Sequence, residues 1–103
     1  MNTPKTIQEA IRQAKCAERA LAILSDPTYA FVAWETSPVC FWIEKDGLLA
    51  YHCELPRWFC SCPDFQRHGD CCKHLLAAEE IVRRAQDAAL CEMAERMAEA
   101  ETA

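Results

Sequence analysis

The sequence predicts an α+β fold in one domain that spans residues 1–103. Three observations favour this fold: a helical pattern at the start of the chain, strand-like segments around a turn signal in the middle, and a cysteine–histidine cluster followed by a second helical pattern. The expected order is an N-terminal helix, a three-stranded antiparallel meander, a zinc knuckle and a C-terminal helix. A chain this short buries only about two-thirds of its unfolded surface, so a bound metal ion would add useful stability.

The N-terminal helix is expected over residues 4–24. Thr6-Ile7-Gln8-Glu9 fits a capping box, in which a hydroxyl and a carboxylate each satisfy a free backbone N–H. Ser25-Asp26-Pro27 should end the helix, because the residue before proline avoids the helical region. Helical spacing predicts an apolar stripe of Ala10, Ala14, Ala17, Leu21 and Leu24.

The sheet is expected over residues 28–54, with strands at 28–35, 39–45 and 48–54. Thr36-Ser37-Pro38 separates the first two strands. Asp46-Gly47 predicts a two-residue hairpin, since glycine tolerates the positive φ of a type I′ turn. The aromatic residues are expected to pack the sheet, and Trp58 is the one placed best to stack on a nucleic-acid base.

A second helix is expected from about Asp70 to Ala100, and its distal part, residues 79–103, is an acidic, alanine-rich tail. The tail is expected to be a solvated helix. Helical spacing predicts a stripe of Leu75, Ala78, Val82, Ala85, Ala89 and Met93.

The stretch CSCPDFQRHGDCCKH, from Cys60 to His74, contains four cysteines and two histidines. Cys60 and Cys62 form a C-x-C pair, and they can converge on one ion if residues 58–62 are extended, because side chains two apart then share a face. Cys72 and His74 form a C-x-H pair. Three cysteines and one histidine are a common structural zinc set.

The second pair can share a metal only if it straddles the start of a helix. Gly69 and Asp70 offer a turn and an N-cap for that start, and the helix dipole would favour a thiolate at Cys72. Cys71 and His74 are three residues apart, which suits one helix face. Spacing alone therefore leaves Cys71 and Cys72 both open as the third ligand.

The longer stretch CSCPDFQRHGDCCKHLLA resembles the SWIM zinc finger, whose pattern is C-x-C, a variable spacer and C-x-H, followed by apolar helical residues. The resemblance implies a ββα finger over residues 57–78 that binds zinc. It also implies that the zinc ligands are Cys60, Cys62, Cys72 and His74. Cys71 departs from the family pattern, which commonly has proline there.

The remaining cysteines and histidines have plainer interpretations. Cys16, Cys40 and Cys91 are each isolated on an apolar face, and they are expected to be buried free thiols. Cys53 is expected in the strand core, although it lies one strand from the cluster. His68 is expected in a solvated loop.

Composition limits the compartment and the partners. The chain has eight cysteines but neither a secretory signal nor an apolar run of about 20 residues, which favours the cytoplasm and excludes a membrane span. The net charge is −5, whereas autonomous DNA binding usually requires a basic face. The basic side chains near the cluster are Arg57, Arg67, His68 and Lys73, diluted by Asp64 and Asp70.

The resemblance implies a binding module for protein or DNA. The acidic composition favours a zinc-binding module with a protein partner, acting as an accessory subunit, with regulation of a DNA transaction as the alternative. An enzyme is not expected, because metal ligation would consume the thiols of any Cys–His nucleophilic pair. A third hypothesis is a redox or zinc sensor, in which oxidation of Cys71 and Cys72 ejects the metal.

Overall fold

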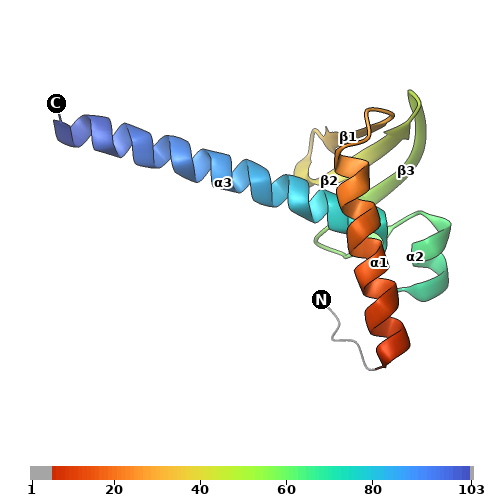
Figure 1. Ribbon diagram of the computed structural model, residues 1–103. Coiled ribbons are helices and arrows are strands. Elements are labelled where there is room, and N and C mark those ends of the chain that lie inside the picture. The colour runs from red at the N-terminus through yellow and green to blue at the C-terminus, as the bar shows by residue number, and fades with distance from the viewer. Residues whose placement is uncertain (1–5, 103) are drawn as a thin grey trace.

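Seven elements follow one another along residues 6–102, the part of the chain that the computed structural model describes, with side chains described through residue 98 (Figure 1). They are α1 (Ile7–Leu24), β1 (Tyr29–Trp34), β2 (Ser37–Lys45), β3 (Leu48–Glu54), β4 (Phe59–Cys60), α2 (Pro63–His68) and α3 (Lys73–Thr102). This arrangement confirms the predicted α+β class. It adds two short elements, β4 and α2, that were not predicted.

The sheet is antiparallel in the order β1-β2-β3-β4, so it has one strand more than the predicted meander. The extra strand is only two residues long, and its Cys60 pairs with Cys53 of β3. The predicted hairpin is confirmed, because Asp46 and Gly47 have φ values of 54° and 79°. The predicted separator 36–38 is too long, since β2 already begins at Ser37.

The N-cap of α1 is confirmed: the Thr6 hydroxyl accepts a hydrogen bond from the Glu9 N–H at 3.0 Å. The helix ends at Leu24, as predicted, whereas positions 4 and 5 of the predicted helix lie outside the described residues.

The predicted apolar stripe of α1 is wrong by one position. Its buried residues are Cys16, Ala20 and Ile23, whereas Ala17 is exposed and Leu21 is 57% exposed. One position corresponds to a rotation of about 100° around the helix axis. The rotation brings Ala20 against Ala77 of α3, and two alanines allow two helices to approach closely.

The first turns of α3 pack on one face of the sheet. Leu75 and Ala78 are fully buried in a cluster with Phe41, Ile43 and Cys53 of the strands. The opposite face of the sheet carries exposed side chains, among them Val32 and Trp42. The core therefore lies between the sheet and α3, and α1 covers the far side of α3 (Figure 1).

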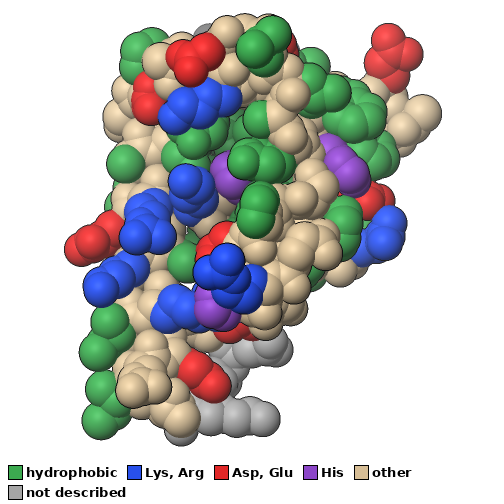
Figure 2. All heavy atoms as spheres, turned by 90° about the vertical axis from the view of Figure 1, so that its right-hand side faces the viewer, with side chains coloured by type: hydrophobic (Ala, Val, Ile, Leu, Met, Phe, Trp, Pro, Cys, Tyr) green, Lys and Arg blue, Asp and Glu red, His purple; other side chains and the backbone are tan. Residues whose placement is uncertain are grey.

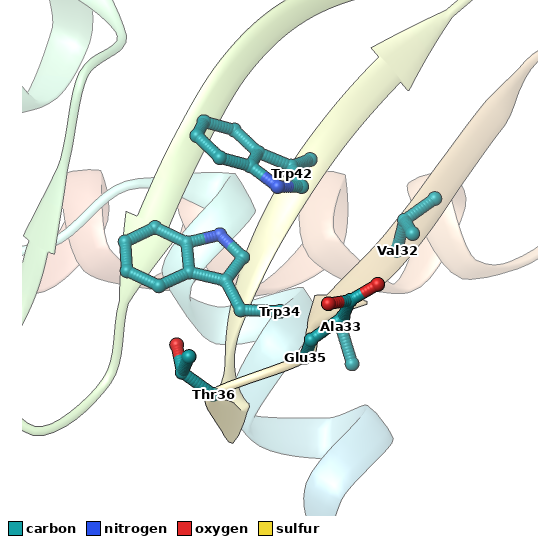
Figure 3. A pocket seen from close by; sticks show the side chains of 6 residues that line it. All are labelled: Val32, Ala33, Trp34, Glu35, Thr36 and Trp42. Atoms are coloured by element: carbon teal, nitrogen blue, oxygen red, sulfur yellow. The ribbon is translucent and has the colours of Figure 1, made fainter.

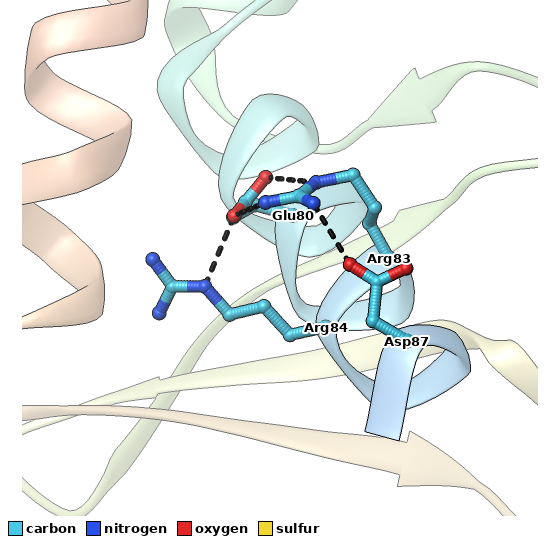
Figure 4. Close-up of polar contacts among 4 residues, drawn as sticks. All are labelled: Glu80, Arg83, Arg84 and Asp87. Carbon is cyan, nitrogen blue, oxygen red and sulfur yellow. Dashed lines mark hydrogen bonds and ion pairs between the residues drawn. The ribbon is translucent and has the colours of Figure 1, made fainter. Parts of the chain in front are cut away.

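The second half of α3 projects away from the sheet and α1 (Figure 1). Residues 83–98 are all exposed, so only the first three residues of the predicted stripe, up to Val82, reach the core. Glu80 accepts hydrogen bonds from Arg83 and Arg84, and Arg83 also pairs with Asp87 (Figure 4). These pairs, three and four residues apart, stabilise an exposed helix, as was expected for the tail. No helix in the described part of the chain has the length and apolarity needed to cross a bilayer.

Candidate metal centre

Four side chains from three neighbouring segments meet in the core. Cys60, Cys62, Cys72 and His74 are all buried, and one donor atom from each lies within 4.8 Å of the other three. The structure thus brings together the four residues that the resemblance implied.

The C-x-C segment is fixed by its pairing with β3. The Ser61 N–H donates to the His52 carbonyl, and the Ser61 hydroxyl accepts from the His52 N–H, both at 3.0 Å. This double contact extends the ladder one residue beyond Cys60. Cys60 and Cys62 then point to the same side, as expected for an extended segment.

Cys62 stands directly before α2, a six-residue helix where a loop was predicted. Its thiol accepts a hydrogen bond from the Phe65 N–H at 3.4 Å, so the cysteine acts as the N-cap. Gly69 ends this helix with φ of 73°, a left-handed conformation that glycine adopts without strain.

Cys72 takes the equivalent place at the start of α3. The helix begins at Lys73, so Cys72 precedes its first residue, and its thiol accepts from the Leu75 N–H. The expected N-cap at Asp70 is therefore wrong by two residues. Because Cys72 stands outside the helix and His74 inside it, the two can turn toward the same point.

The spacing of the donor atoms suits a tetrahedral ion. The Nδ1 atom of His74 is 3.8 Å from the Cys60 sulfur and 4.0 Å from the Cys72 sulfur. A tetrahedral zinc ion with ordinary Zn–S and Zn–N bonds holds its donors about 3.6 Å apart. Only a small contraction would be needed for all four residues to bind one ion.

The ring of His74 is held between aromatic side chains. The Tyr51 ring lies 4.9 Å and the Tyr29 ring 6.3 Å from it, measured between centroids. Nδ1 faces the sulfurs, while the buried Nε2 has no hydrogen-bond partner among the described residues. The imidazole is therefore positioned by packing, with its lone pair available to a metal on the sulfur side.

The three thiols compete for one negative charge. Hydrogen bonds from Cys60 and Cys72 lower the pKa of Cys62 far below that of a free thiol. The hydrogen bond to Cys62 is the main cause that raises the pKa of Cys60 to about 12, and hydrogen bonds to both other thiols raise the pKa of Cys72. The helix start was expected to favour a thiolate at Cys72, whereas among the three thiols the lowered pKa is that of Cys62. A divalent cation would stabilise all three thiolates.

Cys71 lies outside the cluster. Its thiol is beside Cys16 of α1, and burial is the main cause that raises its pKa to about 11. Of the two candidates that the spacing left open, the geometry therefore brings Cys72, and not Cys71, to the other three residues.

Asp70 joins three parts of the molecule. Its carboxylate forms an ion pair with Arg12 of α1 and accepts a hydrogen bond from the Cys71 N–H at 2.8 Å. Its carbonyl accepts from the indole N–H of Trp58. Trp58 is half-buried with φ of 49°, and it packs on the core next to this contact. Trp58 therefore packs on the core, as expected for the aromatic residues in general, and its indole N–H links the finger to Asp70.

The other cysteines and His68 follow their predictions in part. Cys16, Cys40 and Cys53 are buried free thiols, as expected, but Cys91 is exposed because it lies on the projecting half of α3. His68 is exposed as predicted, but it lies in α2 and not in a loop, 3.6 Å from Asp64.

A comparison with protein-family models finds one match, described as SWIM zinc finger, over residues 51–82. The match begins in β3 and ends at the last part of α3 that reaches the core, so it is somewhat longer than the predicted finger. No curated protein and no solved structure matches the chain. The family match and the four-residue cluster agree in position and in residue type. Residues 51–82 therefore match the SWIM zinc finger in sequence and carry a Cys/His cluster that could bind a metal ion.

Proposed function

We propose that the chain is a zinc-binding interaction module in which one zinc ion is held by Cys60, Cys62, Cys72 and His74. The observation that carries this proposal is the convergence of four buried donor atoms within 4.8 Å of one another. Cysteine and histidine together favour zinc among the common divalent ions, and thiolates persist best in a reducing compartment such as the cytoplasm.

The ion would have a structural role. Four protein ligands complete a tetrahedron and leave no position for water, which a catalytic zinc requires. We therefore propose that the chain is not an enzyme. The ion would join β4, α2 and α3, three elements that otherwise share few long-range contacts.

Metal analysis of the purified full-length chain tests this role. The expected result is one zinc per chain, with a clear fall in melting temperature when a strong chelator removes it. The thiols of the three ligand cysteines should resist alkylation before chelation and react after it. A well-folded, metal-free preparation whose cluster thiols react in the native state would contradict the proposal.

A protein partner is supported by the outer face of the sheet. Four rings form a continuous aromatic row across it, and a fifth ring on α2 extends the row, with neighbouring centroids 5.2, 5.8, 5.6 and 5.7 Å apart. The row consists, in order, of Trp34, Trp42, His52, Phe59 and Phe65. Aromatic side chains are enriched in the energetic centres of protein interfaces. Phe59 and Phe65 belong to the finger, so the zinc site would also position one end of this row.

Site-specific photo-crosslinking in the native host tests the protein partner. A photoreactive residue at position 42, on the aromatic row, is expected to capture a defined protein. The control places the same photoreactive residue at Met97, which is 65% exposed on the projecting half of α3. Equal capture from both positions would contradict a role for the row. Capture that persists after the zinc ligands are removed would contradict a role for the zinc site in positioning it.

Nucleic acid is the second candidate, and one feature favours it. Lys and Arg side chains gather along α1 and beside α2 on one face of the molecule (Figure 2). Arg12, Lys15 and Arg19 lie three and four residues apart and so share one stripe of α1, and Arg12 is held against the finger by Asp70. If this face binds phosphates, affinity for DNA should fall steeply with salt and weaken in a Lys15→Gln, Arg19→Gln variant.

A further inference from the structure

We propose that the pocket formed by Trp34, Trp42 and Glu35 recognises one arginine side chain of the protein partner (Figure 3). This inference rests on the proposed protein-binding function and specifies the chemistry of the partner. Neither the zinc site nor the family match includes these residues, because the match begins at residue 51.

The pocket lies on the outer face of the β1–β2 hairpin and has a volume of about 400 Å³. Val32 and Trp42 are cross-strand partners. Trp34 comes directly after a register shift at Ala33, and its ring packs against that of Trp42 on the same face. The turn that follows adds Glu35. The lining residues are Val32, Ala33, Trp34, Glu35, Thr36 and Trp42.

The two indoles offer a preformed aromatic surface. Their ring centroids are 5.2 Å apart with an interplanar angle of 32°, and the ring of His52 packs against both, at 6.2 and 5.8 Å. Trp42 nevertheless remains 43% exposed. Rings that are held by one another and still open on one side can bind a cation without rearrangement.

The charge around the pocket is complementary to a cation. Figure 3 shows the two indoles on one side of the pocket and the Glu35 carboxylate on the other. The lining contains no lysine or arginine, and residues 25–56 carry five acidic side chains and a single basic one, Lys45. The Lys45 ammonium is itself engaged, 4.4 Å from the centroid of the Tyr29 ring.

Arginine suits this geometry better than lysine does. A guanidinium is flat, so it can stack on an indole while its edge donates two hydrogen bonds to a carboxylate. A lysine ammonium is a strongly hydrated point charge and cannot make both contacts at once. A pocket with ring faces on one side and a carboxylate on the other therefore suits arginine.

The probe for the test is N-acetyl-arginine-N-methylamide, titrated into the full-length chain while the indole N–H signals are followed by NMR. The signals of Trp34 and Trp42 are expected to shift in a saturable way, with an affinity on the order of millimolar for a single side chain. The Trp58 signal is an internal reference, because its N–H is bonded to the Asp70 carbonyl and neither residue lines the pocket. The matching citrulline compound has nearly the same shape without the charge, and it should shift the two signals much less.

The variant Glu35→Gln is expected to weaken binding of the arginine probe at least about threefold. The control Glu92→Gln makes the same change in net charge on the exposed part of α3, and it should leave binding unchanged. Equal shifts with the citrulline or the matching lysine compound, or an unchanged affinity in Glu35→Gln, would overturn the proposal. Zinc content measured on the same samples shows whether such a failure belongs to the pocket alone or to the whole module.

Discussion

At the scale of single residues, two adjacent cysteines have different surroundings because a helix begins just after them. Cys72 caps α3 and faces the cluster, whereas Cys71 faces Cys16 on α1. A helix that began at Asp70, as the sequence suggested, would have placed Cys71 and His74 on one face. Which of the two cysteines joins the cluster therefore depends on a helix boundary, which is the feature that sequence patterns locate least well.

The pKa values of the cluster lead to a prediction about protons. In the folded, metal-free chain at pH 7, Cys62 is a thiolate because its pKa is lowered, while Cys60, with a pKa of about 12, and Cys72, whose pKa is also raised, are thiols. Zinc binding should then release two protons, so the apparent affinity should rise about a hundredfold for each pH unit near neutrality.

Calorimetry in buffers of different ionisation enthalpy measures this proton release. Release of three or more protons would mean that the metal-free cluster is not preorganised, because three free thiols are almost fully protonated at pH 7. Release of one or none would contradict a set of three thiolate ligands.

At the scale of elements, Asp70 connects α1 to the finger although 58 residues separate it from Arg12. Burial alone would raise the pKa of Asp70, but the hydrogen bonds from Arg12 and from the Cys71 N–H outweigh it and lower the pKa. A lowered pKa means that the stabilising contribution is present above the unfolded pKa of about 4 and is lost as the pH falls through the folded pKa.

The variant Asp70→Asn should reduce the free energy of unfolding at pH 7 by roughly 1–2 kcal/mol, because it leaves the partly buried Arg12 guanidinium without its anion. The matched change Asp64→Asn alters an exposed carboxylate on α2 and should have almost no effect. Urea denaturation at pH 7 and at pH 4 provides the comparison. An equal loss in both variants, or a loss for Asp70→Asn that grows on acidification, would show that the ion pair does not dock α1.

Substitutions in the two halves of α3 should differ in how much they reduce the free energy of unfolding. Leu75→Ala removes a fully buried side chain and should cost about 2–5 kcal/mol, whereas Leu90→Ala removes one that is 64% exposed and should cost less than about 0.5 kcal/mol. Thermal denaturation of the two variants measures the difference. A large loss at Leu90 would mean that the projecting half of α3 is covered by another copy of the chain.

At the scale of the whole molecule, the features that the sequence predicts correctly are local ones. The Thr6 cap and the Asp46-Gly47 turn each depend on a few adjacent residues, and both are confirmed. The features that it misses depend on distant contacts. The rotation of α1 is set by packing on α3 and by the Arg12–Asp70 pair, and no local pattern encodes either contact.

The same distinction applies to the candidate site. The C-x-C and C-x-H pairs, together with the family resemblance, were enough to name the four residues that the structure brings together. The short elements that hold them were missed, because α2 has six residues and β4 two, too few for a periodic pattern. The role of Cys62 as a helix N-cap was missed for another reason, because cysteine is not among the usual N-cap residues.

The central claim is that one zinc ion is bound by Cys60, Cys62, Cys72 and His74. The most direct test compares the zinc content of two purified variants, Cys72→Ser and Cys71→Ser, which differ only in which of two adjacent thiols is lost. Cys71→Ser is expected to retain one zinc per chain, and Cys72→Ser is expected to bind zinc far more weakly and lose it to a mild chelator. Full zinc content in Cys72→Ser, or loss of zinc in Cys71→Ser alone, would contradict the account.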